Sequence, residues 1–448
     1  MCIFSNLLIY SKDLKNLIVP LFLEQLLMAL VGIADVFVIG FVGEAAVSGV
    51  SLVNSFNTIF LNLFTALASG GAVVISQYIG HKDKEHAGQA ASQLLTASVI
   101  LSVAISVVIL LTNASLMRLM FGKVDADVMD ACVTYLRISA YSYPALAIYN
   151  AGAALYRSFG KTSTTMYISI LANIINVIGN CIGVFGLHAG VVGVAVPSLV
   201  SRCFSAVVIT ILCFSAKNPV SYLGSWIMKL DVSLQKKILR IAVPNGVESG
   251  VFQLVKVALS SVVALFGTYQ IAANGVAQSI WSLAALVCVT MGPVFITVIG
   301  QCMGAGDIEQ AEMYFRKLTK ITLVFAIAWN ALIFAVTPVF MSFYALEDQT
   351  KRLVILLVLI HNIFNAVAFT FADPLGKGLR ATGDVKFTTA TSLFTTIGVR
   401  LIFSMIFGIW LNLGVIGIAF AMCLDWSVRG IIFWWRFKQG KWKTFKVI

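Results

Sequence analysis

The chain consists mainly of long apolar runs separated by short polar stretches. Each run has about 20 residues, enough for a helix to cross the ~30 Å hydrocarbon core of a bilayer. Because polar and apolar residues do not alternate every second position, helices are favoured over β-barrel strands. Twelve spans are predicted, at residues 14–41, 52–78, 92–112, 131–153, 164–186, 190–214, 238–266, 276–300, 319–342, 353–375, 388–410 and 414–435.

The composition supports an integral membrane protein. Of the 448 residues, 59% are hydrophobic and only 11% are charged, whereas soluble domains carry about 25% charged residues. No sizeable soluble domain fits between the spans. The first span follows Lys12 and Lys15, is too long for a signal-peptide core and lacks a small-residue cleavage site, so we expect it to be retained.

The basic residues that produce the net charge of +12 gather in alternate connections between spans. These connections contain Lys12 and Lys15, Lys82 and Lys84, Arg157 and Lys161, residues 217–240, 316–320 and 377–386, and the tail 436–446. An excess of Lys and Arg is typical of cytoplasmic loops. We therefore expect both termini in the cytoplasm, which agrees with an even number of spans, and no nucleic-acid partner.

Sequence motifs for catalysis and metal binding are absent from the chain. The eight cysteines lie mostly in apolar runs without a C-x-x-C pair, and only His81 and His86 are close in sequence. There is no nucleophile elbow, Walker loop or H-E-x-x-H motif. We expect no enzyme, no ATP-driven pump, no metal and no cofactor.

An internal repeat becomes visible when the chain is shifted by 224 residues, half its length. The shift aligns Val19-Pro20 with Val243-Pro244, Glu24 with Glu248, and Gln77, Gly80 and Asp83 with Gln301, Gly304 and Asp307. A one-residue slip aligns Arg157 and Gly160 with Arg380 and Gly383. Two parallel repeats of six spans predict a transporter with its substrate between the halves near the membrane midplane, although channels and scaffold subunits can also be duplicated.

This repeat predicts two six-helix lobes, residues 1–214 and 238–448, joined by a basic cytoplasmic linker at 215–237. Pro20 and Pro244 occupy equivalent positions in the first and seventh spans. Because proline removes a backbone hydrogen bond, we expect both to act as hinges.

The first span carries two acids, Glu24 and Asp35. They lie about 20° apart around the helix and about 16 Å apart along it. A charge at a span centre costs at least ~2.5 kcal/mol, so such residues are functional candidates. Partial desolvation of a carboxylate favours its neutralisation by H⁺ or Na⁺. Asp35 is therefore the first and Glu24 the second candidate for cation coupling. The alternative is that they are hydrogen-bonded residues of helix packing.

The seventh span differs from the first at the positions that carry this chemistry. Leu259 replaces Asp35 and Lys256 replaces Gly32. Glu248 and Lys256 share a face two turns apart, so they either pair with each other or separately line a substrate cavity.

Other polar residues within spans have structural or functional interpretations. Asp425 and Arg429, four residues apart, predict a structural ion pair. The sequence names no partner for Arg202 or Arg400, and Asp373 is a minor candidate for coupling. Three asparagines on one side of the fifth span suit either helix packing or hydrogen bonds in a cavity: Asn173, Asn176 and Asn180.

Over its whole length the chain resembles the multidrug and toxic-compound extrusion (MATE) family, nearest to its bacterial DinF-like branch. The resemblance rests on the order, spacing and duplication of several motifs. They are VPLFLEQLLMALVGIADVFVIGFVG, SQYIGHKDKEHAGQA, ALYRSFGKTS, VPNGVESGVFQLVKVALSSVVALFG, LRATGDVKFT and MCLDWSVRGIIFWWRFKQGKWK.

The resemblance implies two lobes around a V-shaped cavity and export of cationic or amphipathic compounds in exchange for H⁺ or Na⁺. The family's aspartate in the first helix matches Asp35. Some members use an acid farther along the seventh helix, where this chain has Phe252 and Gln253, with Glu248 a turn earlier. This departure favours coupling through Asp35 and leaves Gln253 as a cavity candidate.

We therefore expect a monomeric exporter of small organic substrates in a bacterial cytoplasmic membrane. The alternative is a flippase for lipid-linked oligosaccharides or cell-wall precursors, which would use cavity cations such as Arg202, Lys256, Arg400 and Arg429. Twelve spans, against the fourteen usual in such flippases, and the acid in the first helix favour the exporter.

Overall fold

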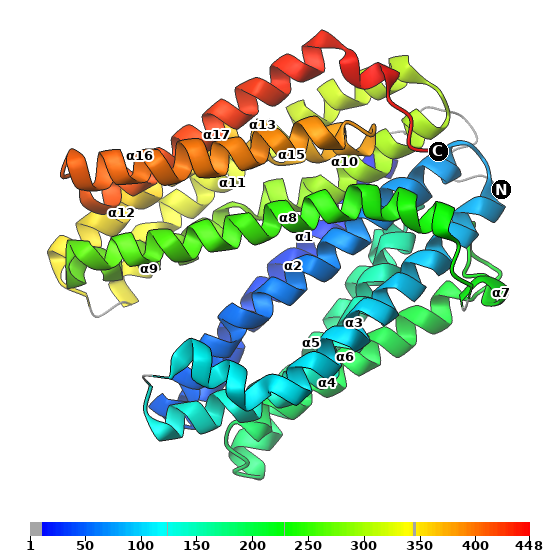
Figure 1. The fold of residues 1–448 in the computed structure, drawn as a ribbon. Coiled ribbons are helices and arrows are strands. Elements are labelled where there is room, and N and C mark those ends of the chain that lie inside the picture. The colour runs from blue at the N-terminus through cyan, green and yellow to red at the C-terminus, as the bar shows by residue number, and fades with distance from the viewer. Residues whose placement is uncertain (1–10, 123, 228, 344–345) are drawn as a thin grey trace. The chain divides into compact units, whose positions relative to one another are not determined.

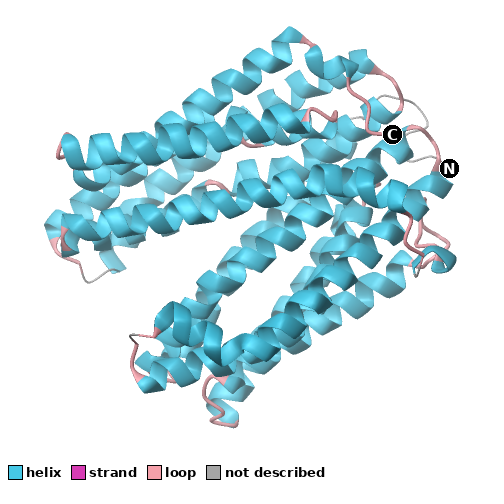
Figure 2. Ribbon diagram, in the orientation of Figure 1, coloured by secondary structure: helices cyan, strands magenta, loops and turns pink. Residues whose placement is uncertain are grey.

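The computed structural model describes residues 11–122, 124–227, 229–343 and 346–448. Within these ranges every regular element is a helix, as Figure 2 shows. They include 11 helical segments that are long and apolar enough to cross a membrane. The prediction of an all-helical membrane protein is confirmed.

The chain divides into two compact units, with the boundary between Gly246 and Val247 inside α8. Unit 1 is the part up to Gly246 and unit 2 is Val247–Ile448. The helices of unit 1 are α1 (Ser11–Gly40), α2 (Glu44–Gly80), α3 (Lys84–Phe121), α4 (Ala126–Ser158), α5 (Thr162–Cys181), η1 (Ile182–Gly186), α6 (Val192–Cys213), α7 (Gly224–Ile227) and the first part of α8 (Val232–Val263).

Helix α4 is the predicted span that is not among the 11 apolar segments. It packs against α2, α3 and α6, and α3–α6 lie side by side in Figure 1. Its buried residues include Tyr135, Ser139, Ser142 and Tyr143. A helix enclosed by other helices needs less apolar surface than one facing lipid, which explains its polar composition.

Unit 2 is built from shorter helical pieces, several of which join end to end within one predicted span. They are η2 (Ala264–Phe266), α9 (Thr268–Ala284), α10 (Leu286–Gly304), α11 (Ile308–Phe343), α12 (Asp348–Phe364), η3 (Asn365–Phe369), α13 (Thr370–Ala372), α14 (Pro374–Ala381), α15 (Val385–Phe394), η4 (Thr395–Leu401), α16 (Ile402–Met405), η5 (Ile406–Trp410), α17 (Gly414–Gln439) and η6 (Lys441–Thr444). Pro244 lies inside α8 and Pro20 inside α1.

The backbone repeats with the same 224-residue offset as the sequence. The π-helices η1 and η5 begin 224 residues apart. Left-handed backbone also recurs in pairs, at Lys82 (φ 62°) and Gly306 (73°), at His188 (48°) and Asn412 (53°), and at Gly190 (58°) and Gly414 (56°). Because few side chains adopt positive φ, paired left-handed turns show that the two units share one fold.

Two helix starts are capped in the same way. The carboxylate of Asp83 accepts a hydrogen bond of 3.0 Å from the backbone N–H of His86 at the start of α3. In unit 2 the carboxylate of Asp307 accepts one of 2.9 Å from the N–H of Gln310 at the start of α11. Each cap satisfies a helix N–H that otherwise has no partner in the helix.

The stretch between α6 and α8 is attached to α3 of unit 1. Its anchor is Gln93, whose Nε2 donates to the backbone oxygen of Trp226 at 3.0 Å. The Oε1 of Gln93 accepts from the backbone N–H of Asp231 at 3.1 Å and from Nε2 of Gln235 at 3.0 Å. These contacts hold the connecting segment against α3.

Candidate functional site

The half-buried Asp35 of α1 faces the polar side of α5, because the two helices pack together. Nδ2 of Asn176 donates to both carboxylate oxygens of Asp35, at 3.0 and 3.1 Å. Nδ2 of Asn180 donates to Oδ1 at 2.7 Å. The carboxylate is therefore held by two neutral amides.

A second layer fixes the orientation of these amides. Ser198 of α6 donates to Oδ1 of Asn176 at 3.0 Å, which turns the amide nitrogen of Asn176 towards Asp35. Asn180 is completely buried, and its Oδ1 has no hydrogen-bond partner among the described residues. A carboxylate and an unused amide oxygen thus lie close together.

Arg202 of α6 is near this site without forming an ion pair with Asp35. Its Nη1 donates to the hydroxyl of Ser142 at 2.6 Å, and its charge also acts on Asp35 and on the buried Tyr135. Within the described ranges Arg202 has no acidic partner at ion-pair distance. It supplies positive potential near the site but does not lock the carboxylate.

Glu24, the second acid of α1, has a different environment. Only 1% of its surface is exposed, and its Oε1 accepts from Nη2 of Arg157 at 2.9 Å. Thr165 of α5 donates to Oε2 at 3.0 Å, and Tyr149 donates to Oε1 at 3.3 Å. Glu24 is thus neutralised by an arginine and enclosed by hydroxyls.

The same arrangement recurs in unit 2. Arg380 donates to Glu248, and its Nε donates to the hydroxyl of Thr388 at 3.2 Å. The sequence repeat aligns Glu24 with Glu248 and Arg157 with Arg380, but it does not show that each Glu meets its Arg. The pairing of Glu248 with Lys256, one of two alternatives from the sequence, is not found.

A buried acid in α17 is shared by two arginines. Asp425 has no exposed surface, and it lies 2.8 Å from Arg429 and 2.8 Å from Arg400. Arg429 also donates to Thr395 and Thr396 at 3.0 and 2.8 Å. Asp425 and Arg429 therefore form an ion pair, and Asp425 is also the partner that the sequence could not name for Arg400.

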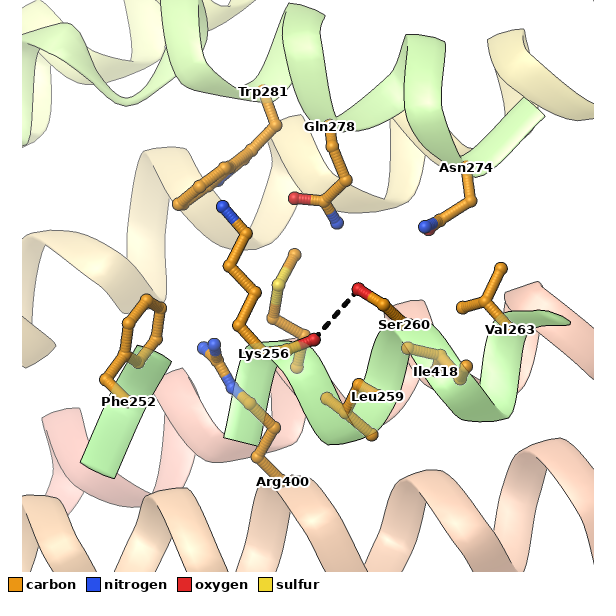
Figure 3. A pocket seen from close by; sticks show the side chains of 11 residues that line it. Phe252, Lys256, Leu259, Ser260, Val263, Asn274, Gln278, Trp281, Arg400 and Ile418 are labelled. Carbon is orange, nitrogen blue, oxygen red and sulfur yellow. Dashed lines mark hydrogen bonds between the residues drawn. The ribbon is translucent and has the colours of Figure 1, made fainter. Parts of the chain in front are cut away.

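Unit 2 contains a pocket of about 100 Å³, shown in Figure 3. It lies between α8, α9, η4 and α17. Its lining residues are Phe252, Lys256, Leu259, Ser260, Val263, Asn274, Gln278, Trp281, Arg400, Ile418 and Met422. Of the cavity residues proposed from the sequence, Lys256 and Arg400 line this pocket, whereas Gln253 and Glu248 do not.

Asp35 differs in charge compensation from the other four acids that lie inside the spans predicted from the sequence. Each of the others lies within ion-pair distance of a basic side chain: Glu24 with Arg157, Glu248 with Arg380, Asp373 with Lys377 at 2.8 Å, and Asp425 with two arginines. In the part of the chain that the structure describes, no three His, Cys, Asp or Glu side chains gather as metal ligands.

Comparison with known proteins shows relatives over nearly the whole chain. The family model MatE matches residues 20–182 and 244–406, two segments with the same 224-residue offset as the repeat. The uncharacterized transporter YisQ of Bacillus subtilis is 25% identical over 441 residues, covering 96% of this chain and 94% of YisQ. The probable multidrug resistance protein NorM of Thermotoga maritima is 23% identical over 444 residues, covering 98% of this chain and 94% of NorM.

Solved structures show the same fold. A MATE family transporter of the MOP superfamily, solved in an outward-facing conformation, superposes with a TM-score of 0.89. It is 22% identical in sequence, and the match covers 96% of this chain and 95% of that chain.

Proposed function

Since the chain belongs to the MatE family of membrane transporters, we propose that it is a secondary active antiporter that exports cationic or amphipathic drugs and metabolites in exchange for H⁺ or Na⁺ by alternating access. Relatives named as multidrug resistance proteins support an exporter, and they do not favour the alternative of a precursor flippase. The proposal places the protein in a bacterial cytoplasmic membrane, as a monomer with both termini in the cytoplasm.

The observation that carries the proposal is the environment of Asp35. Both carboxylate oxygens of Asp35 accept hydrogen bonds from neutral amides, and no basic residue of the described spans forms an ion pair with Asp35. A carboxylate in such a place needs a cation when it is desolvated. It can therefore gain and lose H⁺ or Na⁺ as solvent access changes, whereas a carboxylate paired with arginine already has its charge balanced.

The free amide oxygen of Asn180 supports the same role. Hard cations are bound by carboxylate and amide oxygens, and Asn180 presents an unused one beside Asp35. We propose Asp35 as the coupling carboxylate, with Asn176 and Asn180 as residues that position it. Glu24 has the weaker case, because Arg157 already compensates its charge.

The test uses purified protein in proteoliposomes, with ethidium as the transported probe. An imposed proton gradient and an imposed sodium gradient are applied in separate experiments. We expect Asp35→Asn to reduce gradient-driven ethidium transport at least tenfold. A tenfold change corresponds to about 1.4 kcal/mol, which is on the order of what one hydrogen bond to a charged group contributes. The gradient that drives transport by the parent protein identifies the coupling ion.

Asp127→Asn is the matched control, because it makes the same chemical change at an exposed position of the same unit. We expect it to transport like the parent. If Asp35→Asn transports at the parental rate under both gradients, the assignment of Asp35 is wrong.

A further inference from the structure

The pocket of unit 2 occupies the same place in the repeat as the Asp35 site of unit 1. Shifting by 224 residues carries Asp35 onto Leu259, Asn176 onto Arg400 and Ser198 onto Met422. All three of these unit 2 residues line the pocket. The two units therefore present equivalent sites on equivalent helices.

The chemistry of the two sites is opposite in charge. In unit 2 the acid is lost, because Leu259 stands at the position of Asp35, and an arginine replaces Asn176. Lys256 replaces Gly32 and adds a second cation. With these residues the potential of the unit 2 pocket favours anions, whereas that of the Asp35 site favours cations.

The positive charge of the pocket is not balanced. Lys256 has no acidic partner among the residues that the structure describes. Arg400 contacts Asp425, but Asp425 also contacts Arg429, so one acid serves two arginines. A lysine on a membrane-spanning helix is costly unless it faces a polar cavity or a partner, and an anionic ligand would supply that partner.

Several donors converge on the pocket. Figure 3 shows Lys256 extending from α8 between Arg400 and the α9 residues Trp281 and Gln278. Arg400 is only 6% exposed, and its Nε has no hydrogen-bond partner among the described residues. The indole N–H of Trp281 also has no hydrogen-bond partner among the described residues. Buried donors without partners are rare in folded proteins, which indicates that a ligand supplies the acceptors.

Part of the lining is apolar. It includes Phe252 and Leu259 of α8 and Ile418 of α17. The guanidinium carbon of Arg400 lies 4.9 Å from the centre of the Phe252 ring. A ligand that fits these walls has a small acidic group joined to an apolar body.

We propose that this pocket binds the acidic head group, carboxylate or phosphate, of an amphipathic substrate. Ammonium and guanidinium donors both form short, charge-assisted hydrogen bonds with such oxygens. This inference rests on the proposed function and specifies one class of its amphipathic substrates: compounds with a negative group that unit 2 recognises, while Asp35 in unit 1 binds the exchanged cation.

The test compares three small ligands of similar shape and different charge: benzoate, benzamide and benzylammonium. The full-length protein is placed in nanodiscs of phosphatidylcholine, and binding is measured by calorimetry without any ion gradient. We expect benzoate to bind about tenfold more tightly than the other two, since a carboxylate forms stronger hydrogen bonds with ammonium and guanidinium donors than a neutral amide does. Equal affinities for all three ligands would overturn the proposal.

Variants locate the effect in the pocket. Lys256→Gln should weaken benzoate binding about tenfold, and Lys256→Glu should make benzylammonium the preferred ligand. Lys320→Gln, the same change at an exposed lysine of unit 2, is the control and should bind benzoate like the parent. Parental benzoate affinity in both Lys256 variants would also refute the inference.

Two possible sources of the acidic group are separated by repeating the titration in discs that contain phosphatidylglycerol. Weaker benzoate binding there indicates that the head group of an anionic lipid occupies the pocket, and unchanged binding indicates a soluble acid. Because no gradient is applied, failure of this test is distinct from failure of the Asp35 transport test.

Discussion

Charged residues within the spans differ in how their charge is compensated. Glu24 and Glu248 each face an arginine, and Asp425 faces two. Asp35 is held by amides. A paired charge is already balanced within the unit, so the pairs serve the structure, and we propose the amide-bound carboxylate of Asp35 for cation exchange.

The Glu24–Arg157 pair yields a prediction on stability. Removing one partner of a fully buried ion pair costs about 3–5 kcal/mol, and we expect a smaller cost here because the side chain of Arg157 is 22% exposed. We expect Glu24→Gln to lower the thermal midpoint of the detergent-solubilised protein, and Glu24→Gln with Arg157→Gln to lower it less. Glu44→Gln, at an exposed acid of the same unit, is the control. An unchanged midpoint for Glu24→Gln would contradict the structural role.

At the level of elements, local signals decide where helices begin and how they face one another. Asp83 and Asp307 cap α3 and α11 in the same way. The asparagines of α5 lie three to four residues apart, so they form one face, and that face meets the acidic side of α1. One face of α5 thus supplies the two amides that hold Asp35.

The cap at Asp83 gives a pH-dependent prediction, since Asp83 lies in the loop between two spans. Its hydrogen bond from the backbone N–H of His86 lowers the pKa of the Asp83 carboxyl below the ordinary value of about 3.9. A lowered folded-state pKa stabilises the protein above the unfolded pKa, and this contribution is lost as the pH falls through the folded pKa.

We therefore expect Asp83→Ala to cost about 0.5–2 kcal/mol at neutral pH, with the difference from the parent shrinking below about pH 4. Thermal unfolding at a series of pH values measures it. Asp125→Ala is the control, because Asp125 stands at the start of α4 without a side-chain capping hydrogen bond. A difference that stays constant down to pH 3 would exclude the carboxylate as its source.

At the scale of the whole molecule, the two units have the same fold, but their equivalent sites carry opposite charges. The equivalent sites hold Asp35 in unit 1 and Lys256 with Arg400 in unit 2. The proposed antiport requires one site for an inorganic cation and one for an organic substrate. We propose Asp35 for the first and the unit 2 pocket for the second.

The alternation of basic connections predicts the orientation of the whole chain. We expect a green fluorescent protein fused after Ile448 to fluoresce and alkaline phosphatase at the same place to be inactive, because both report a cytoplasmic C-terminus. Alkaline phosphatase fused after Gly122, beyond the third span, should be active. The opposite pattern at both positions would reverse the proposed topology.

The sequence by itself determined the helical spans and the repeat. These features depend on residues close together in the chain and on the bilayer, which requires long apolar helices. Only the tertiary structure decided the partners of the charges. Glu24 and Arg157 are 133 residues apart in the chain, and Arg400 of η4 forms its ion pair with Asp425 of α17. Such pairs depend on which helix faces pack together, and hydropathy does not encode that choice.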